Sequence, residues 1–108
     1  MTITRETLEL AAKAAGIELD VWDAPWRGDM VFKNVSNGCE WRPHLDGNDA
    51  GELARKLHML IDFEDDDSGH VMCADPTTDM YWPRDCSNWK EAATLCAAAV
   101  QRAKEGGK

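Results

Sequence analysis

The sequence predicts an α+β fold with the element order αββαββα, in which a mostly antiparallel sheet carries helices on both faces (an α-β-α sandwich). Stretches with a helical apolar period alternate along the chain with short stretches of period two. The period-two stretches come in pairs joined by short turns, which favours antiparallel pairing. Aliphatic and Trp side chains fall on alternate faces of these strands, which favours helices on both sides of the sheet.

The length and charge of the chain limit the classes of partner. Its 108 residues predict a single domain over residues 1–108, large enough to bury a core without disulfides or a metal. The 20 acidic residues against 12 basic ones give a formal charge of −8. This charge argues against direct binding to nucleic acid or to an anionic membrane, and it suits a protein partner with a basic surface. No apolar run is long enough to span a bilayer.

The four cysteines are expected to be free thiols. The chain shows no charged segment followed by an apolar run that would indicate a signal peptide, so we expect a cytoplasmic protein. Two disulfides would be expected only with signs of export. Cys73 and Cys96 are interpreted as small core residues, because free cysteine is readily buried.

The first part of the chain predicts a helix followed by a hairpin. The helix is expected from Thr2 or Thr4 to Gly16, where glycine provides a natural stop. Ile17–Val21 alternates apolar and acidic residues and predicts a strand. A loop rich in Pro and Gly separates it from a second predicted strand, Met30–Val35.

A Trp-Pro segment leads into the central helix. Asp49 is the predicted N-cap, with Glu52 three residues later completing a capping-box pattern. Trp41 lies just upstream, where we expect it to be buried with Pro43 fixing the approach of the chain. The apolar face of the helix is predicted to comprise Ala50, Leu53, Ala54, Leu57 and Leu60.

The last third predicts a second hairpin and a long helix. Ile61–Glu64 and His70–Ala74 are the expected strands, joined by an acidic turn, and residues 75–87 are expected to be irregular. Asn88 is the predicted cap of the final helix, with Glu91 three residues later. The apolar face of this helix is predicted to comprise Trp89, Ala92, Ala93, Cys96, Ala99, Val100 and Ala103.

A resemblance to a known family covers roughly the segment from Trp41 to the C-terminus. The pattern Trp41-x-Pro43-x-Leu45-Asp46-Gly47-x-Asp49-Ala50, followed by Leu53-Ala54-x-x-Leu57 and an alternating strand, resembles the phage ABA sandwich domain of small phage and prophage proteins. The alanine-rich helix at 92–99 is similar as well. The family places Leu directly after Pro, where this chain has His44, and the second hairpin is more acidic here. The resemblance implies a phage or prophage protein with an α-β-α sandwich, and it brings no catalytic residues to carry over.

No motif in the chain dictates a reaction, so we predict no catalytic residue, no metal ligand and no cofactor. His70, Cys73, Cys39 and Cys86 are zinc-ligand types, but positions 70 and 73 of one strand face opposite sides. The acidic residues Asp62, Glu64, Asp65, Asp66 and Asp67 either bind a divalent cation or form a solvated turn that discourages aggregation.

The leading hypothesis is therefore a small acidic phage or prophage accessory protein that binds a host or phage protein in the host cytoplasm. Inhibition of a host process such as antiviral defence is one such role. Tryptophan is enriched at binding hot spots but also fills cores, so both readings of the Trp residues stay open. The alternatives are a small metal-dependent or Cys/His enzyme, and an acidic mimic of DNA; a homo-oligomer is compatible with all of them. The candidate binding residues are Asp65, Asp66, Asp67, Trp22, Trp26 and Trp82.

Overall fold

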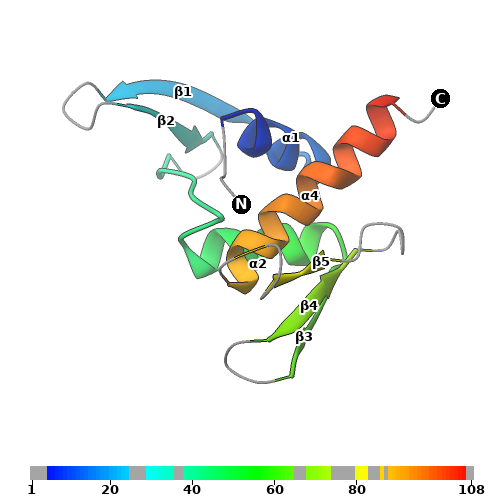
Figure 1. Cartoon of the computed structure of the whole chain (residues 1–108). Coiled ribbons are helices and arrows are strands. Elements are labelled where there is room, and N and C mark those ends of the chain that lie inside the picture. Colours follow the sequence, from blue (N-terminus) through cyan, green and yellow to red (C-terminus); the bar gives the residue numbers. More distant parts are fainter. Residues whose placement is uncertain are drawn as a thin grey trace.

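The computed structural model describes residues 5–24, 29–35, 38–64, 68–73, 80–82, 86 and 88–106, with only the backbone described for 21–24, 29–31 and 80. The α+β class, the antiparallel pairing and the order αββαββα are confirmed, and one two-residue strand, β5, is added to that order (Figure 1). The elements are α1 (Arg5–Ala15), β1 (Leu19–Ala24), β2 (Asp29–Asn34), α2 (Gly47–Lys56), β3 (Leu60–Phe63), β4 (Gly69–Met72), β5 (Met80–Tyr81) and α4 (Trp89–Gly106).

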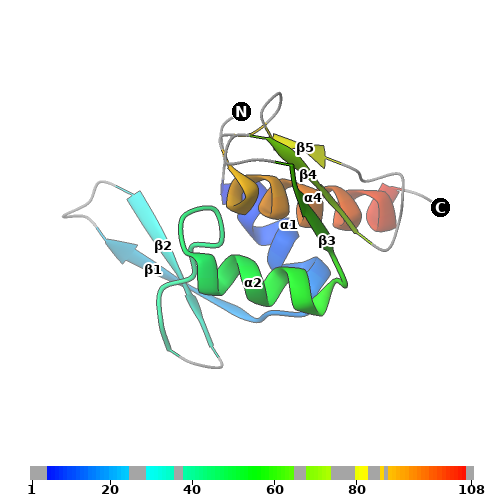
Figure 2. The same ribbon diagram turned by 90° about the horizontal axis from the view of Figure 1, so that it is seen from below.

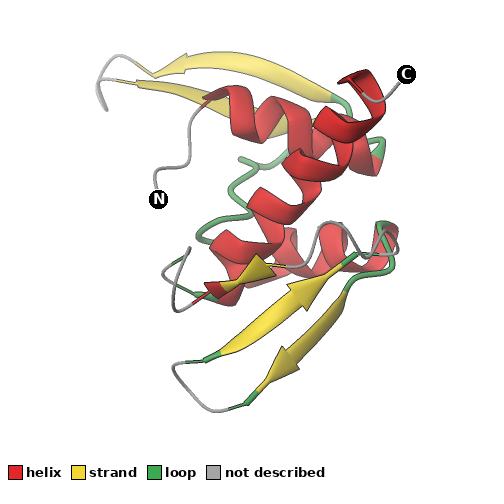
Figure 3. Ribbon diagram, turned by 45° about the vertical axis from the view of Figure 1, so that its right-hand side comes forward, coloured by secondary structure: helices red, strands yellow, loops and turns green. Residues whose placement is uncertain are grey.

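The strands form two separate sheets, where the sequence predicted a single sheet between two layers of helices. The first sheet is the hairpin β1–β2, and the second has the order β3-β4-β5 with antiparallel pairs throughout. Figure 3 shows the sheets on opposite sides of the helices, and the view of Figure 2 agrees. The central layer is therefore helical.

Helix α4 explains this arrangement, because it is buried on all sides over residues 92–98. The buried face predicted from the sequence was too narrow, since Thr94, Leu95 and Ala97 are buried too, whereas Ala103 near the end of the helix is exposed. Small side chains let neighbouring elements approach the helix closely from several directions, and a helix that is apolar all round is typically a core helix. The helix begins as predicted, with the Glu91 amide donating to Oδ1 of Asn88 at 3.0 Å.

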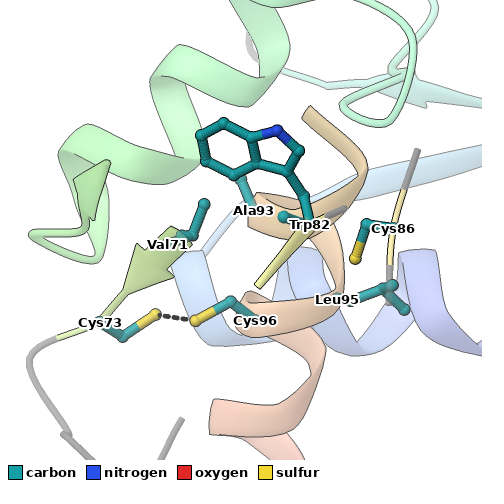
Figure 4. Packing of buried hydrophobic residues seen from close by; sticks show 8 residues of the cluster. Val71, Cys73, Trp82, Cys86, Ala93, Leu95 and Cys96 are labelled. Carbon is teal, nitrogen blue, oxygen red and sulfur yellow. Dashed lines mark hydrogen bonds between the residues drawn. The ribbon is translucent and has the colours of Figure 1, made fainter. Parts of the chain in front are cut away.

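Two core clusters lie on different sides of α4. The first sits between α4 and the second sheet, and the second lies between α4, α1 and α2. Figure 4 shows part of the first cluster. The buried members of the first cluster are Val71, Cys73, Trp82, Cys86, Ala92, Ala93, Leu95 and Cys96. Those of the second are Ala11, Ala12, Ile17, Trp41, Leu53 and Ala97.

The chain enters α2 through a fixed turn, and the N-cap is Asp46 rather than the predicted Asp49. The backbone of Asp46 is extended, and its carboxylate accepts from the Asn48 amide at 2.8 Å. The carboxylate of Asp49 instead accepts from the amide of Arg42 at 2.8 Å. Trp41 and Pro43 are fully buried, which confirms the predicted anchor. Within the described residues, no helix has the length and apolar content needed to cross a membrane.

Candidate functional site

The second sheet has one face that no described element covers. Residues directly opposite in an antiparallel pair point to the same side of the sheet, and the sides alternate along each strand. Asp62 is opposite His70, and His70 is opposite Tyr81. Val71 and Cys73 point to the other side and are buried against α4. We call the uncovered side the outer face; its described side chains are Leu60, Asp62, His70, Met72 and Tyr81.

The outer face carries exposed apolar side chains on its two edge strands, β3 and β5, and it is acidic at the end near the hairpin turn. Leu60 is 59% exposed and Tyr81 is 47% exposed. Phe63 is also exposed, but the alternation places it on the other side of the sheet, where its ring contacts Trp82 and Trp89 edge-on at centroid distances of 5.4 and 6.2 Å. Two of the five large apolar side chains exposed in the described part of the chain, Leu60 and Tyr81, therefore lie on the outer face. Exposed apolar side chains that share one uncovered face are typical of an interaction surface.

His70 is the most constrained polar side chain of the outer face. Its ring lies 4.8 Å from that of Tyr81, centroid to centroid, at an interplanar angle of 42°. Its Nδ1 atom is buried, and within the described residues it has no hydrogen-bond partner. A buried imidazole nitrogen without a partner costs free energy, so this atom would gain from a ligand or a donor that approaches the face.

Asp62, Glu64 and His70 place one potential metal-binding atom each within 4.8 Å of one another. Imidazole nitrogen and carboxylate oxygen are both zinc ligands, so this trio could supply three ligands of an open tetrahedral site. Cys73 and Cys86 lie in the core on the other side of the sheet. His70 and Cys73, two members of the zinc set considered from the sequence, are therefore on opposite sides of the sheet, as the strand geometry predicted.

The candidate binding residues named from the sequence have different outcomes. Asp65, Asp66, Asp67 and Trp26 lie outside the described residues, and so does the side chain of Trp22, whose backbone forms part of β1. Trp82 is described, and its assignment to a binding surface was wrong. It is 3% exposed and belongs to the core cluster between the second sheet and α4 (Figure 4).

Sequence reasoning missed Leu60 and Tyr81. Leu60 continues the helical period of Leu53 and Leu57, so it was assigned to the apolar face of the central helix. Tyr81 lay in a segment without a clear period. The register of β3, β4 and β5 is what brings these two residues to one face.

A hollow of 360 Å³ lies on a different part of the molecule, along α1 and the start of β1. Its charged groups Glu6, Glu9 and Lys13 are exposed, and the Lys13 ammonium is 3.1 Å from the carboxylate of Glu105 on α4. This ion pair links the two helices. Among the described residues that line the hollow, no set of buried polar groups converges as in a small-molecule site.

Comparison of the chain with protein-family models, with curated proteins and with solved structures gives no match.

Proposed function

We propose that the chain is a small phage or prophage accessory protein that binds a host or phage protein through the outer face of the second sheet. The observation that carries this proposal is the pair of exposed apolar side chains, Leu60 and Tyr81, on a face that no described element covers. The opposite face of the same sheet already packs on α4, so the outer face is not needed for the core.

The chemistry of the face indicates what the partner offers. Asp62 and Glu64 stand beside the apolar pair, and the whole chain carries a formal charge of −8. Apolar and charged side chains next to one another on one exposed face are typical of protein interfaces. The partner is therefore a protein with an apolar patch bordered by basic side chains, and charge attraction accelerates the encounter.

The biological setting of the proposal comes from the resemblance of the Trp41–Leu57 segment to the phage ABA sandwich domain. If the partner is a host protein, binding alters a process of the host, and inhibition of antiviral defence in the host cytoplasm is the leading example. The alternative of an acidic DNA mimic stays a prediction, because Asp65, Asp66 and Asp67 lie outside the described residues.

Site-specific photo-crosslinking tests the proposal. A photoreactive phenylalanine analogue is placed at position 60 or, as a control, at position 45, because Leu60 and Leu45 are both 59% exposed. The experiment is performed in bacterial cells that express the chain. We expect a discrete crosslinked species from position 60 and none from position 45. Equal crosslinking from both positions, or none from position 60, would contradict the proposed face.

A second candidate function is binding of a divalent metal ion, and one specific observation favours it: the ligand atoms of Asp62, Glu64 and His70 lie within 4.8 Å of one another. Bound zinc would neutralise part of the acidic end of the outer face and would join β3 to β4 through its ligands Asp62 and His70. Metal binding is compatible with a role in protein binding. Zinc titration of the purified chain, described in the Discussion, tests it separately.

A further inference from the structure

Two buried thiols meet between the second sheet and α4. Cys73 follows the last residue of β4, and Cys96 lies in the middle of α4, 23 positions later. Their Sγ atoms are 2.7 Å apart and point toward each other (Figure 4). No disulfide joins the two cysteines in this structure.

This separation is too short for ordinary packing of two thiols. Non-bonded carbon atoms, which are smaller than sulfur, pack at about 3.5–4.0 Å. The two sulfur atoms of a disulfide lie about 2.05 Å apart, so this pair is nearer to a covalent bond than to a van der Waals contact. The fold thus holds the two sulfur atoms within a short movement of bonding distance.

The elements that carry the two cysteines also keep them in place. Val71 on β4 and Ala93 on α4 are fully buried members of the cluster that contains both thiols. Closing the bond therefore requires the two Sγ atoms, 2.7 Å apart, to approach by roughly 0.65 Å.

We infer that Cys73 and Cys96 form an intrachain disulfide by exchange with a small disulfide such as oxidised glutathione. Cys73 is 8% exposed and Cys96 is 0% exposed, so the Cys73 thiolate attacks first and releases one glutathione thiol. The Cys96 thiolate then attacks the Cys73 sulfur of the mixed disulfide and releases the second. The two protein thiols lose two electrons and two protons, and one oxidised glutathione becomes two reduced molecules.

The bond would tie β4 to α4 across the first core cluster. It would close a loop between positions 73 and 96 and so lower the conformational entropy of the unfolded chain. The melting temperature Tm should rise as a result. The expected rise is roughly 10–15 °C for a domain of this size. The inference is independent of the proposed binding function, because it concerns the inner side of the sheet.

Thiol mapping of the purified full-length chain tests the inference. The protein is incubated with oxidised glutathione, unfolded, alkylated and analysed by mass spectrometry, with a sample in reductant as reference. The Cys39→Ser variant is the background, because Cys39 is exposed and open to side reactions. We expect two of the three remaining thiols to escape alkylation, a Cys73–Cys96 linked peptide, and a higher Tm that reductant reverses.

Cys73→Ala and Cys96→Ala in the same background are the matched variants. Each should form no intrachain bond and show no oxidative rise in Tm. Cys86→Ala should still form the bond, since Cys86 is in the same cluster but outside the proposed pair. The inference is overturned if all three thiols of the background protein remain alkylatable, if the linked peptide contains Cys86, or if the bond forms without raising Tm.

Discussion

The backbone amide of Arg42 donates a 2.8 Å hydrogen bond to Oδ2 of Asp49 across the turn that leads into α2. Arg42 lies between Trp41 and Pro43, both fully buried, and Asp49 lies in the first turn of the helix. The bond therefore fixes the direction in which the chain leaves the β2 region and enters α2. The Trp41 amide donates to the Phe32 carbonyl at 2.7 Å, which ties the same turn to β2.

The effect of replacing Asp49 on the free energy of unfolding should depend on pH. Burial raises the pKa of Asp49, although the hydrogen bond from Arg42 lowers it. Since the pKa is raised in the folded state, ionised Asp49 opposes folding above that pKa, and the penalty disappears as the pH falls through it. Asp49→Asn keeps an acceptor for the Arg42 amide, so it should be at least as stable as the parent at neutral pH. This advantage should be lost below about pH 4.

Asp49→Ala is the matched variant, because it removes the acceptor together with the charge. Its free energy of unfolding should lie below that of Asp49→Asn by about 0.5–1.5 kcal/mol. Urea unfolding at neutral pH and below about pH 4 measures the free energy of unfolding of the parent and of both variants. An advantage of Asp49→Asn that stays constant down to the lower pH would refute the assignment of the raised pKa.

Trp41→Ala should destabilise the protein by roughly 3–5 kcal/mol, because it leaves a cavity in the cluster between α1, α2 and α4. That loss is a large part of a total stability of about 5–15 kcal/mol. The indole Nε1 atom is buried and makes no hydrogen bond within the described residues, so Trp41→Phe removes no bond of this kind. Chemical unfolding should show that Trp41→Phe has a much larger free energy of unfolding than Trp41→Ala. Equal losses would show that the indole nitrogen, rather than the ring volume, stabilises the site.

Gly69 tests the packing of the second hairpin. A methyl group at this position would collide with the backbone oxygen of Asp62 and with the indole of Trp82, and the backbone φ is +153°. Gly69→Ala should therefore lower the free energy of unfolding by roughly 1–3 kcal/mol. Gly51→Ala is the control: apart from the chain neighbours and the backbone of α2, no described atom lies within 4 Å of its added Cβ, and it should stabilise by about 0.5–1 kcal/mol. If thermal melts show that both variants have a higher Tm than the parent, or that both have a lower one, this packing is contradicted.

Zinc should stabilise the folded chain if Asp62, Glu64 and His70 bind it. At a free zinc concentration one hundred times Kd, the gain is about 2.7 kcal/mol, which corresponds to a Tm rise of roughly 10 °C. His70→Asn should abolish the rise, and His58→Asn, which removes an exposed histidine elsewhere, should retain it. Differential scanning calorimetry in the Cys39→Ser background avoids binding by the exposed thiol. If His70→Asn shows the same rise as His58→Asn, the metal lies elsewhere.

The sequence predicted the local elements and the anchor better than it predicted how the elements meet. Trp41 and Cys96 could be assigned to the core because an aromatic residue before Pro and a helical apolar period are local signals. Leu60 was assigned to the wrong element, because α2 ends at Lys56 with Leu57 as its C-cap. His58, just beyond, has a positive φ of 54° without the glycine that usually signals such an end. The strands divide into two sheets because α4 is enclosed by other elements between them. No local sequence pattern predicts that arrangement.

The central claim is that the outer face of the second sheet binds a partner. The most direct test measures how tightly the partner captured by crosslinking binds two double variants. Leu60→Ser with Tyr81→Ser removes the apolar pair of the face, whereas Val35→Ser with Leu45→Ser removes two exposed apolar side chains outside it. Calorimetric titration should show Kd weakened at least about tenfold by the first pair and unchanged by the second, since a few apolar anchors carry most binding energy. If the first pair binds like the parent while the second loses affinity, the binding surface is not the outer face.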